Sequence, residues 1–112
     1  METITIEVGE AGEDQIKKSF QGEWLVNDVS PEQDDSGVTW DGGTKYSVAK
    51  TAKGQLLVYE FDERQYKGSY RVVADFNELE DAEIGPYPAV PRNVVALVAN
   101  ALDIEYIVEM DI

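Results

Sequence analysis

The sequence predicts an α+β fold, an antiparallel β-meander sheet of five to seven strands with one buried C-terminal helix packed on it. Three observations predict it. Several short segments alternate between apolar and polar residues, glycine-containing turns separate most of them, and one stretch near the C-terminus has apolar residues at helical spacing. With 112 residues, of which 43% are apolar, the chain suits one domain spanning residues 1–112.

The N-terminal quarter predicts two strands. Residues 2–8 alternate strictly, with Ile4 and Ile6 on one face, which is typical of a half-buried strand. Residues 15–29 predict a longer strand, in which Gly22 indicates a bulge or a bend. The polar, acidic segment 30–37 that follows predicts a loop.

The centre of the chain predicts a series of hairpins. Strands are expected at residues 38–40, 44–52, 55–62 and 69–75, with turns at 41–43, 53–54 and 66–68. Each turn contains glycine, which supplies the positive φ that tight hairpin turns need. Connections this short favour an antiparallel meander.

The C-terminal third predicts helices and a last strand. Residues 76–84 predict one or two turns of acidic helix, capped by Asp75 or Asn77. Residues 92–102 predict the buried helix. Its expected stripe is Val94, Val95, Leu97, Val98, Ala101 and Leu102. Residues 103–112 return to period two, which predicts a final strand with an acidic outer face.

Composition excludes several classes of function. Without Cys or His the chain cannot build a Ser-His-Asp triad, a cysteine nucleophile, a disulfide framework or an ordinary zinc site. Nine basic against 23 acidic residues give a net charge of −14, which opposes direct binding to nucleic acid or anionic membranes. No membrane-length apolar run or secretion signal is present, so we expect a cytoplasmic protein. Because the usual catalytic combinations of side chains are missing, we also expect a non-enzymatic protein without a cofactor.

The acidic residues are concentrated in parts of the chain. Residues 75–112 hold nine acids and one base, whereas residues 44–53 hold three lysines and no acid. The candidate partner-binding acids are those of the last strand and the loop: Asp103, Glu105, Glu109, Asp111, Asp34 and Asp35. Carboxylates two residues apart on a strand lie roughly 6.5–7 Å apart, a spacing comparable with successive phosphates of nucleic acid.

This pattern suggests a non-enzymatic acidic interaction protein that binds a protein partner through an acidic, strand-edge surface. The sharper hypothesis is a nucleic-acid-mimicking inhibitor from a phage or mobile element, whose partner is a basic nucleic-acid-binding protein. Outward charge that protects an edge strand from aggregation explains the same acids without a partner. A homo-oligomer joined through an edge strand is a further hypothesis.

An alternative function is a small-ligand-binding or enzymatic domain with a pocket between the tyrosine-rich sheet and the helix, lined by Tyr46, Tyr59 and Tyr70. Packing within the core or across strands explains the same aromatic residues. Ser47 and Lys50 match the S-x-x-K motif of penicillin-binding enzymes, but residues three apart on a strand point to opposite faces, which favours coincidence.

Two carboxylates on one strand, Glu60 and Asp62, are spaced like a pair that could do acid–base chemistry. Basic residues of the neighbouring hairpin, Arg64, Lys67 and Arg71, are the expected ion-pair partners. We therefore predict that these carboxylates form cross-strand pairs.

Segments 2–9, 20–22, 46–54 and 57–59 resemble the core of the small bacterial EXLDI proteins, named for a C-terminal E-x-L-D-I signature. Asp111 and Ile112 match its last two positions, whereas Met110 replaces Leu and Val108 replaces Glu. Many EXLDI proteins begin with a ribbon-helix-helix-like DNA-binding segment, which has no counterpart in residues 1–112. The resemblance therefore implies the accessory domain alone, and it implies no catalytic residue.

Overall fold

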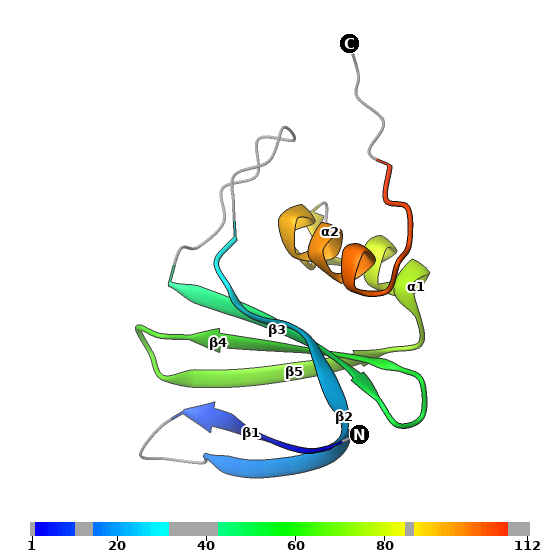
Figure 1. Ribbon diagram of the computed structural model, residues 1–112. Helices are drawn as coiled ribbons and strands as arrows, with labels where there is room; N and C mark the ends of the chain where they lie inside the picture. Colours follow the sequence, from blue (N-terminus) through cyan, green and yellow to red (C-terminus); the bar gives the residue numbers. More distant parts are fainter. Residues whose placement is uncertain (1, 11–14, 32–42, 85–86, 108–112) are drawn as a thin grey trace.

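Two layers form the fold: a closed barrel of five antiparallel strands, and two helices that lie together on one side of it (Figure 1). The structure is a computed structural model that describes residues 2–10, 15–31, 43–84 and 87–107. The barrel strands are β1 (Glu2–Glu10), β2 (Ile16–Val29), β3 (Thr44–Thr51), β4 (Leu56–Asp62) and β5 (Lys67–Val73). The helices are α1 (Phe76–Asp81) and α2 (Arg92–Ala101), and β6 (Glu83–Ile84) pairs with β7 (Tyr87–Pro88) between them.

The α+β class and the meander order are confirmed, but the sheet closes on itself. Each barrel strand pairs antiparallel with the next, and β1 also pairs with β5 at Gly9–Gly68 and Glu10–Lys67. A Cβ at Gly68 would overlap the Glu7 carbonyl oxygen, so only glycine lets β1 approach β5 this closely. The predicted meander did not include this closure, because Gly68, which the sequence predicts to lie in a turn, pairs with Gly9 of β1.

The barrel strands separate two hydrophobic cores. The barrel core has Ile4, Ile6, Ala49 and Leu57 at its centre. The helical core lies between the outer faces of the strands and the helices. Its most buried members are Val48, Val58, Leu79, Val94 and Val98. The central residues of β3 and β4 are buried on both faces, because alternate side chains point into different cores.

Strand β2 serves both cores because it bends. Its pairing with β3 shifts register between Trp24 and Val26 and again before Val29. Trp24 packs against the barrel core, whereas Val26 belongs to the helical core. The predicted irregularity therefore lies after Gly22. Gly22 itself allows a close approach, since a Cβ there would lie 2.5 Å from the Lys50 carbonyl oxygen.

Both predicted helices are present. Asp75 caps α1, because its Oδ1 accepts a hydrogen bond of 2.9 Å from the Glu78 amide. Helix α2 buries Val94, Val95, Val98 and Ala99. The predicted stripe is corrected at Leu97, which is 44% exposed, and at Ala101, which is also exposed. Within the described part of the chain, neither helix is long and apolar enough to cross a membrane.

The predicted last strand does not form over residues 103–107, and residues 108–112 lie outside the described residues. Helix α2 ends instead in a Schellman motif: the Asp103 amide donates to Asn100 O at 3.2 Å, and the Ile104 amide donates to Ala99 O at 2.8 Å. Asp103 adopts the left-handed conformation that this motif needs, with φ 59°. Of the apolar residues in this segment, Tyr106 packs on the helical core, whereas Ile104 is exposed.

Candidate binding site

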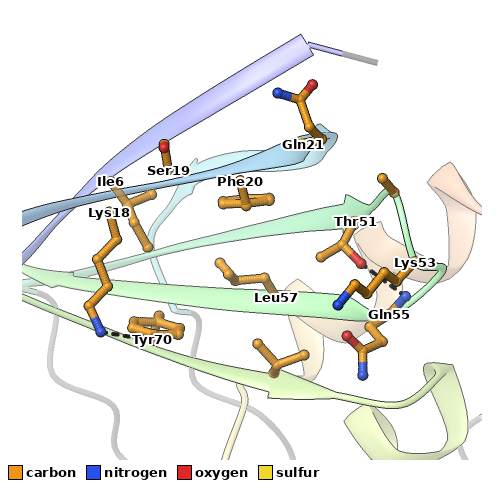
Figure 2. Close-up of a pocket in the computed structure, with 12 residues that line it drawn as sticks. Ile6, Lys18, Ser19, Phe20, Gln21, Thr51, Lys53, Gln55, Leu57 and Tyr70 are labelled. Carbon is orange, nitrogen blue, oxygen red and sulfur yellow. Dashed lines mark hydrogen bonds between the residues drawn. The ribbon is translucent and has the colours of Figure 1, made fainter.

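The described residues of the barrel surround a cavity of about 460 Å³, here called the split hollow. It lies between the β1–β2 hairpin, the β3–β4 turn and β5 (Figure 2). Its lining consists of Ile6, Lys18, Ser19, Phe20, Gln21, Thr51, Ala52, Lys53, Gln55, Leu57, Tyr70 and Val72. Its volume lies within the range of small-ligand sites, roughly 300–1,000 Å³.

Strand register explains why apolar side chains face this hollow. Residues opposite each other in an antiparallel pair share a face, and Ile6 lies opposite Lys18. In the same way Leu57 lies opposite Val72, on the inward face of β4 and β5. Among the described residues the β1–β5 ladder consists of two pairs at one end. Beyond them the inward face of β5 stays open, so Tyr70 is 38% and Val72 is 44% exposed.

Lys18 marks one polar end of the split hollow. Its ammonium donates a hydrogen bond of 3.1 Å to the Tyr70 hydroxyl and lies 5.0 Å from the centroid of that ring. A cation this close to an aromatic face is attracted by the ring quadrupole. Tyr70 therefore holds the charged end of Lys18 at the edge of an apolar surface.

The β3–β4 turn forms the other polar end, with Thr51, Lys53 and Gln55 (Figure 2). A hydrogen bond of 2.9 Å from the Ala52 amide to Gln21 O fixes the turn to β2. A bond of 3.2 Å from the Gln55 amide to Thr51 Oγ1 closes the turn itself. This rigid turn brings a second lysine to the hollow.

The charge of the lining differs in sign from the charge of the chain. Two of its twelve residues are lysines and none is acidic, although the chain has 23 acidic and nine basic residues. The split hollow is therefore a locally basic, largely apolar site in an acidic protein.

Two of the predicted partner-binding acids belong to the described residues, and they lie outside the split hollow. Asp103 and Glu105 are exposed beside the helices, and Asp103 also ends α2. The segment that carries them packs next to α1, because the Tyr106 and Phe76 rings meet edge to face at 6.1 Å. Glu109, Asp111, Asp34 and Asp35 lie outside the described residues.

The three candidate tyrosines do not share a pocket. Tyr46 is 6% exposed and belongs to the helical core, whereas Tyr70 lines the split hollow inside the barrel. Tyr59 also faces the barrel, where its hydroxyl donates a hydrogen bond of 2.6 Å to Glu7 O. The predicted common lining is wrong, since Tyr46 lies opposite Glu60, whose side chain points to the other face of β4 from its neighbour Tyr59.

Burial raises the pKa of the Tyr59 hydroxyl above its ordinary value. The negative charge of Glu7 raises this pKa further. Tyr59 is therefore a neutral hydrogen-bond donor across the physiological range. Its ring stacks on that of Phe61, two residues along the same strand, with centroids 6.4 Å apart.

The short motifs have structural roles. Buried Ser47 donates a hydrogen bond of 3.1 Å to Asn27 Oδ1 and accepts one of 3.0 Å from the Asp28 amide. Lys50 points to the opposite face of β3, so Ser47 and Lys50 lack the S-x-x-K geometry. The predicted cross-strand pairing is confirmed for Glu60, whose carboxylate lies 2.6 Å from the Arg71 guanidinium.

The sequence prediction missed Lys18. The available signal was the spacing of Ile16, Lys18 and Phe20. Residues two apart on a strand share a face, so Lys18 lies between two apolar residues on the same face. No protein-family model, curated protein or solved structure matches this chain. The resemblance to EXLDI proteins therefore stays a prediction.

Proposed function

We propose that this protein is a non-enzymatic binding protein and that the split hollow holds the apolar part of a small ligand. The observation that carries the proposal is the 460 Å³ cavity itself. Ile6, Phe20, Leu57 and Val72 give it apolar walls, and a few polar groups lie at its two ends. Apolar cavities with a few placed polar groups are typical of small-molecule sites.

Apolar burial supplies the driving force for such binding. Each methylene removed from water contributes about 0.8 kcal/mol. Tyr70 and Val72 are partly exposed to solvent. A ligand chain in the hollow would cover these side chains. The lining holds no carboxylate that could act as a general base, which favours binding over catalysis.

Filling the hollow tests the proposal. Val72→Trp should fill the cavity and reduce the affinity for the neutral fluorescent probe N-phenyl-1-naphthylamine at least about tenfold, because about 1.4 kcal/mol of contact is lost. Titration of probe fluorescence measures the affinity. Ser69→Trp is the matched control, since Ser69 lies on the same strand with its side chain on the outer face.

Binding of the probe to the Ser69→Trp variant should match binding to the parent protein. Equal affinity of the parent and Val72→Trp proteins would contradict the proposal. So would the absence of probe binding to the parent protein.

A second candidate is the acidic interaction protein expected from the sequence, with a cytoplasmic location. It is favoured by a group of exposed acids on the helical side, here called the helical acidic face: Glu80, Asp81, Asp103 and Glu105. In this proposal the partner is a basic protein, and mimicry of nucleic acid is its sharpest form. Homo-oligomerisation through a strand edge stays a prediction of the sequence.

A further inference from the structure

We infer that the ligand of the split hollow is a single-chain aliphatic carboxylate, with its chain on the apolar walls and its carboxylate on Lys18 and Tyr70. The inference rests on the proposed function, because it names the chemistry of the ligand in the same site. It is carried by the charge of the lining, the position of Lys18, and the donors that Lys18 and Tyr70 offer together.

The first step is charge complementarity. The only charged side chains among the twelve described residues of the lining are Lys18 and Lys53. An apolar ligand without charge would gain nothing from these two ammonium groups, and a cationic ligand would be repelled by them. A negatively charged head group on an apolar chain therefore fits this lining best.

The second step is the position of Lys18. Because Lys18 lies opposite Ile6 in the β1–β2 ladder, its side chain starts on the inward face of the barrel. Its methylene groups can lie along the apolar wall while the ammonium stays at the mouth. Figure 2 shows this ammonium beside Tyr70, at the opposite end of the hollow from Lys53.

The third step is the set of donors. An ammonium has three N–H donors, so the hydrogen bond to Tyr70 uses one of them. The Tyr70 hydroxyl accepts this bond and can donate its own proton. Lys18 and Tyr70 can therefore each donate a charge-assisted hydrogen bond to a carboxylate, because the acceptor is ionised. Two adjacent donors match the two oxygens of a carboxylate.

A structural explanation of Lys18 makes a different prediction. Inward-pointing charges on exposed strands protect sheets from edge-to-edge aggregation. In that case Lys18 would affect the solubility of the protein and not the affinity for any ligand. Ligand discrimination therefore separates the two explanations.

The experiment compares three ligands with the same chain: decanoate, decanol and decylammonium. Each ligand is titrated, below its micellar concentration, to displace N-phenyl-1-naphthylamine from the 112-residue protein. We expect decanoate to bind about tenfold or more tighter than decanol, from the charge-assisted hydrogen bond, and decylammonium to bind weakest. Shortening the acid should weaken binding about fourfold per methylene.

Lys18→Met keeps the apolar stem and removes the charge. The affinity for decanoate should therefore fall to that for decanol, and the affinity for decanol should be unchanged. Lys17→Met is the matched control. It removes the same charge from the neighbouring residue, which faces outward opposite Glu7, and should change decanoate affinity less than about twofold. Thermal melts followed by circular dichroism confirm that each variant is folded.

Two outcomes would overturn the inference. If the parent protein binds decanol as tightly as decanoate, the hollow does not select a carboxylate, although the proposed function stands. If Lys53→Met abolishes the preference and Lys18→Met does not, the carboxylate site is wrongly placed. Loss of all binding, including that of the neutral probe, would instead contradict the proposed function.

Discussion

Tyr59 is the residue at which barrel closure and barrel core meet. Its ring packs against the barrel core, and its hydroxyl donates to the backbone of β1 at Glu7. Gly68 lies next to the same ring, since a Cβ there would come within 2.5 Å of the hydroxyl oxygen. One side chain therefore fixes the spacing between β1, β4 and β5.

The raised pKa of Tyr59 predicts a loss of stability at high pH. Because the folded-state pKa lies above the unfolded value of 10.0, the contribution of Tyr59 is fully present below that value. It is lost as pH rises through the folded-state pKa. Tyr59→Phe should cost about 1 kcal/mol at about pH 8, from the lost hydrogen bond, and less at about pH 11.

Urea unfolding at both pH values gives these free energies. Tyr66→Phe is the control, because Tyr66 is 63% exposed and its substitution should change stability little at either pH. A cost of Tyr59→Phe that stays constant from about pH 8 to about pH 11 would contradict the prediction.

Single residues also show where the sequence was sufficient. The asparagine or aspartate cap before α1 could be predicted, because capping depends on neighbouring residues alone. The inward position of Lys18 could have been predicted from its spacing from Ile16 and Phe20, which places the three residues on one strand face. Its contact with Tyr70 was not, since the two residues are 52 positions apart and meet only through barrel closure.

At the scale of elements, the alternation of apolar residues predicted strands where β1, β2, β4 and β5 form. The same signal failed at residues 103–107, because Tyr106 packs on the helical core without a neighbouring strand, whereas Ile104 is exposed. Barrel closure could not be predicted either. Glycine is common in turns, so Gly9 and Gly68 give no sequence signal of a strand pair. Only their pairing in the structure distinguishes a closed barrel from an open sheet.

Gly68→Ala should disrupt this closure. A methyl group there would overlap the Glu7 carbonyl oxygen and the Tyr59 hydroxyl, so β1 must move away from β5. We expect a loss of about 2–3 kcal/mol in the free energy of unfolding, the usual upper range for overpacking. Chemical denaturation measures this loss, and hydrogen exchange should show faster exchange at β1 amides.

Gly54→Ala is the matched control for this prediction. Gly54 has φ +81° but no atom within 4 Å of an added Cβ, so its substitution should cost only about 1 kcal/mol of conformational strain. Equal losses for the two variants would contradict the predicted effect of contact with β1 at Gly68.

The whole molecule is more strongly polarised than its net charge suggests. The helical acidic face lies on the side of the helices, and the two lysines of the split hollow lie on the barrel strands and the β3–β4 turn. Such a molecule can attract a basic protein at one side and an anionic ligand at the other.

The helical acidic face can be tested with charge variants. Glu80→Gln combined with Asp81→Asn should reduce the recovery of basic nucleic-acid-binding proteins on a tagged form of this protein at least about threefold, because attraction between opposite charges weakens. Mass spectrometry of proteins released by low-salt and then high-salt washes measures this recovery.

Glu2→Gln combined with Glu10→Gln removes the same charge from β1 and should leave the recovery unchanged. Equal recovery for both double variants would contradict a role of the helical acidic face. So would partners that resist the high-salt wash, since exposed charge pairs are screened by salt.

The double burial of β3 and β4 has a consequence for cooperativity. Val48 and Ala49 are neighbours in the sequence, yet one packs under the helices and the other inside the barrel, and Leu57 and Val58 repeat this arrangement on β4. Because β3 and β4 contribute to both cores, loss of packing in one core also disturbs the strands that support the other core. A ligand that stabilises the barrel should therefore also slow the opening of α2, which never touches the split hollow.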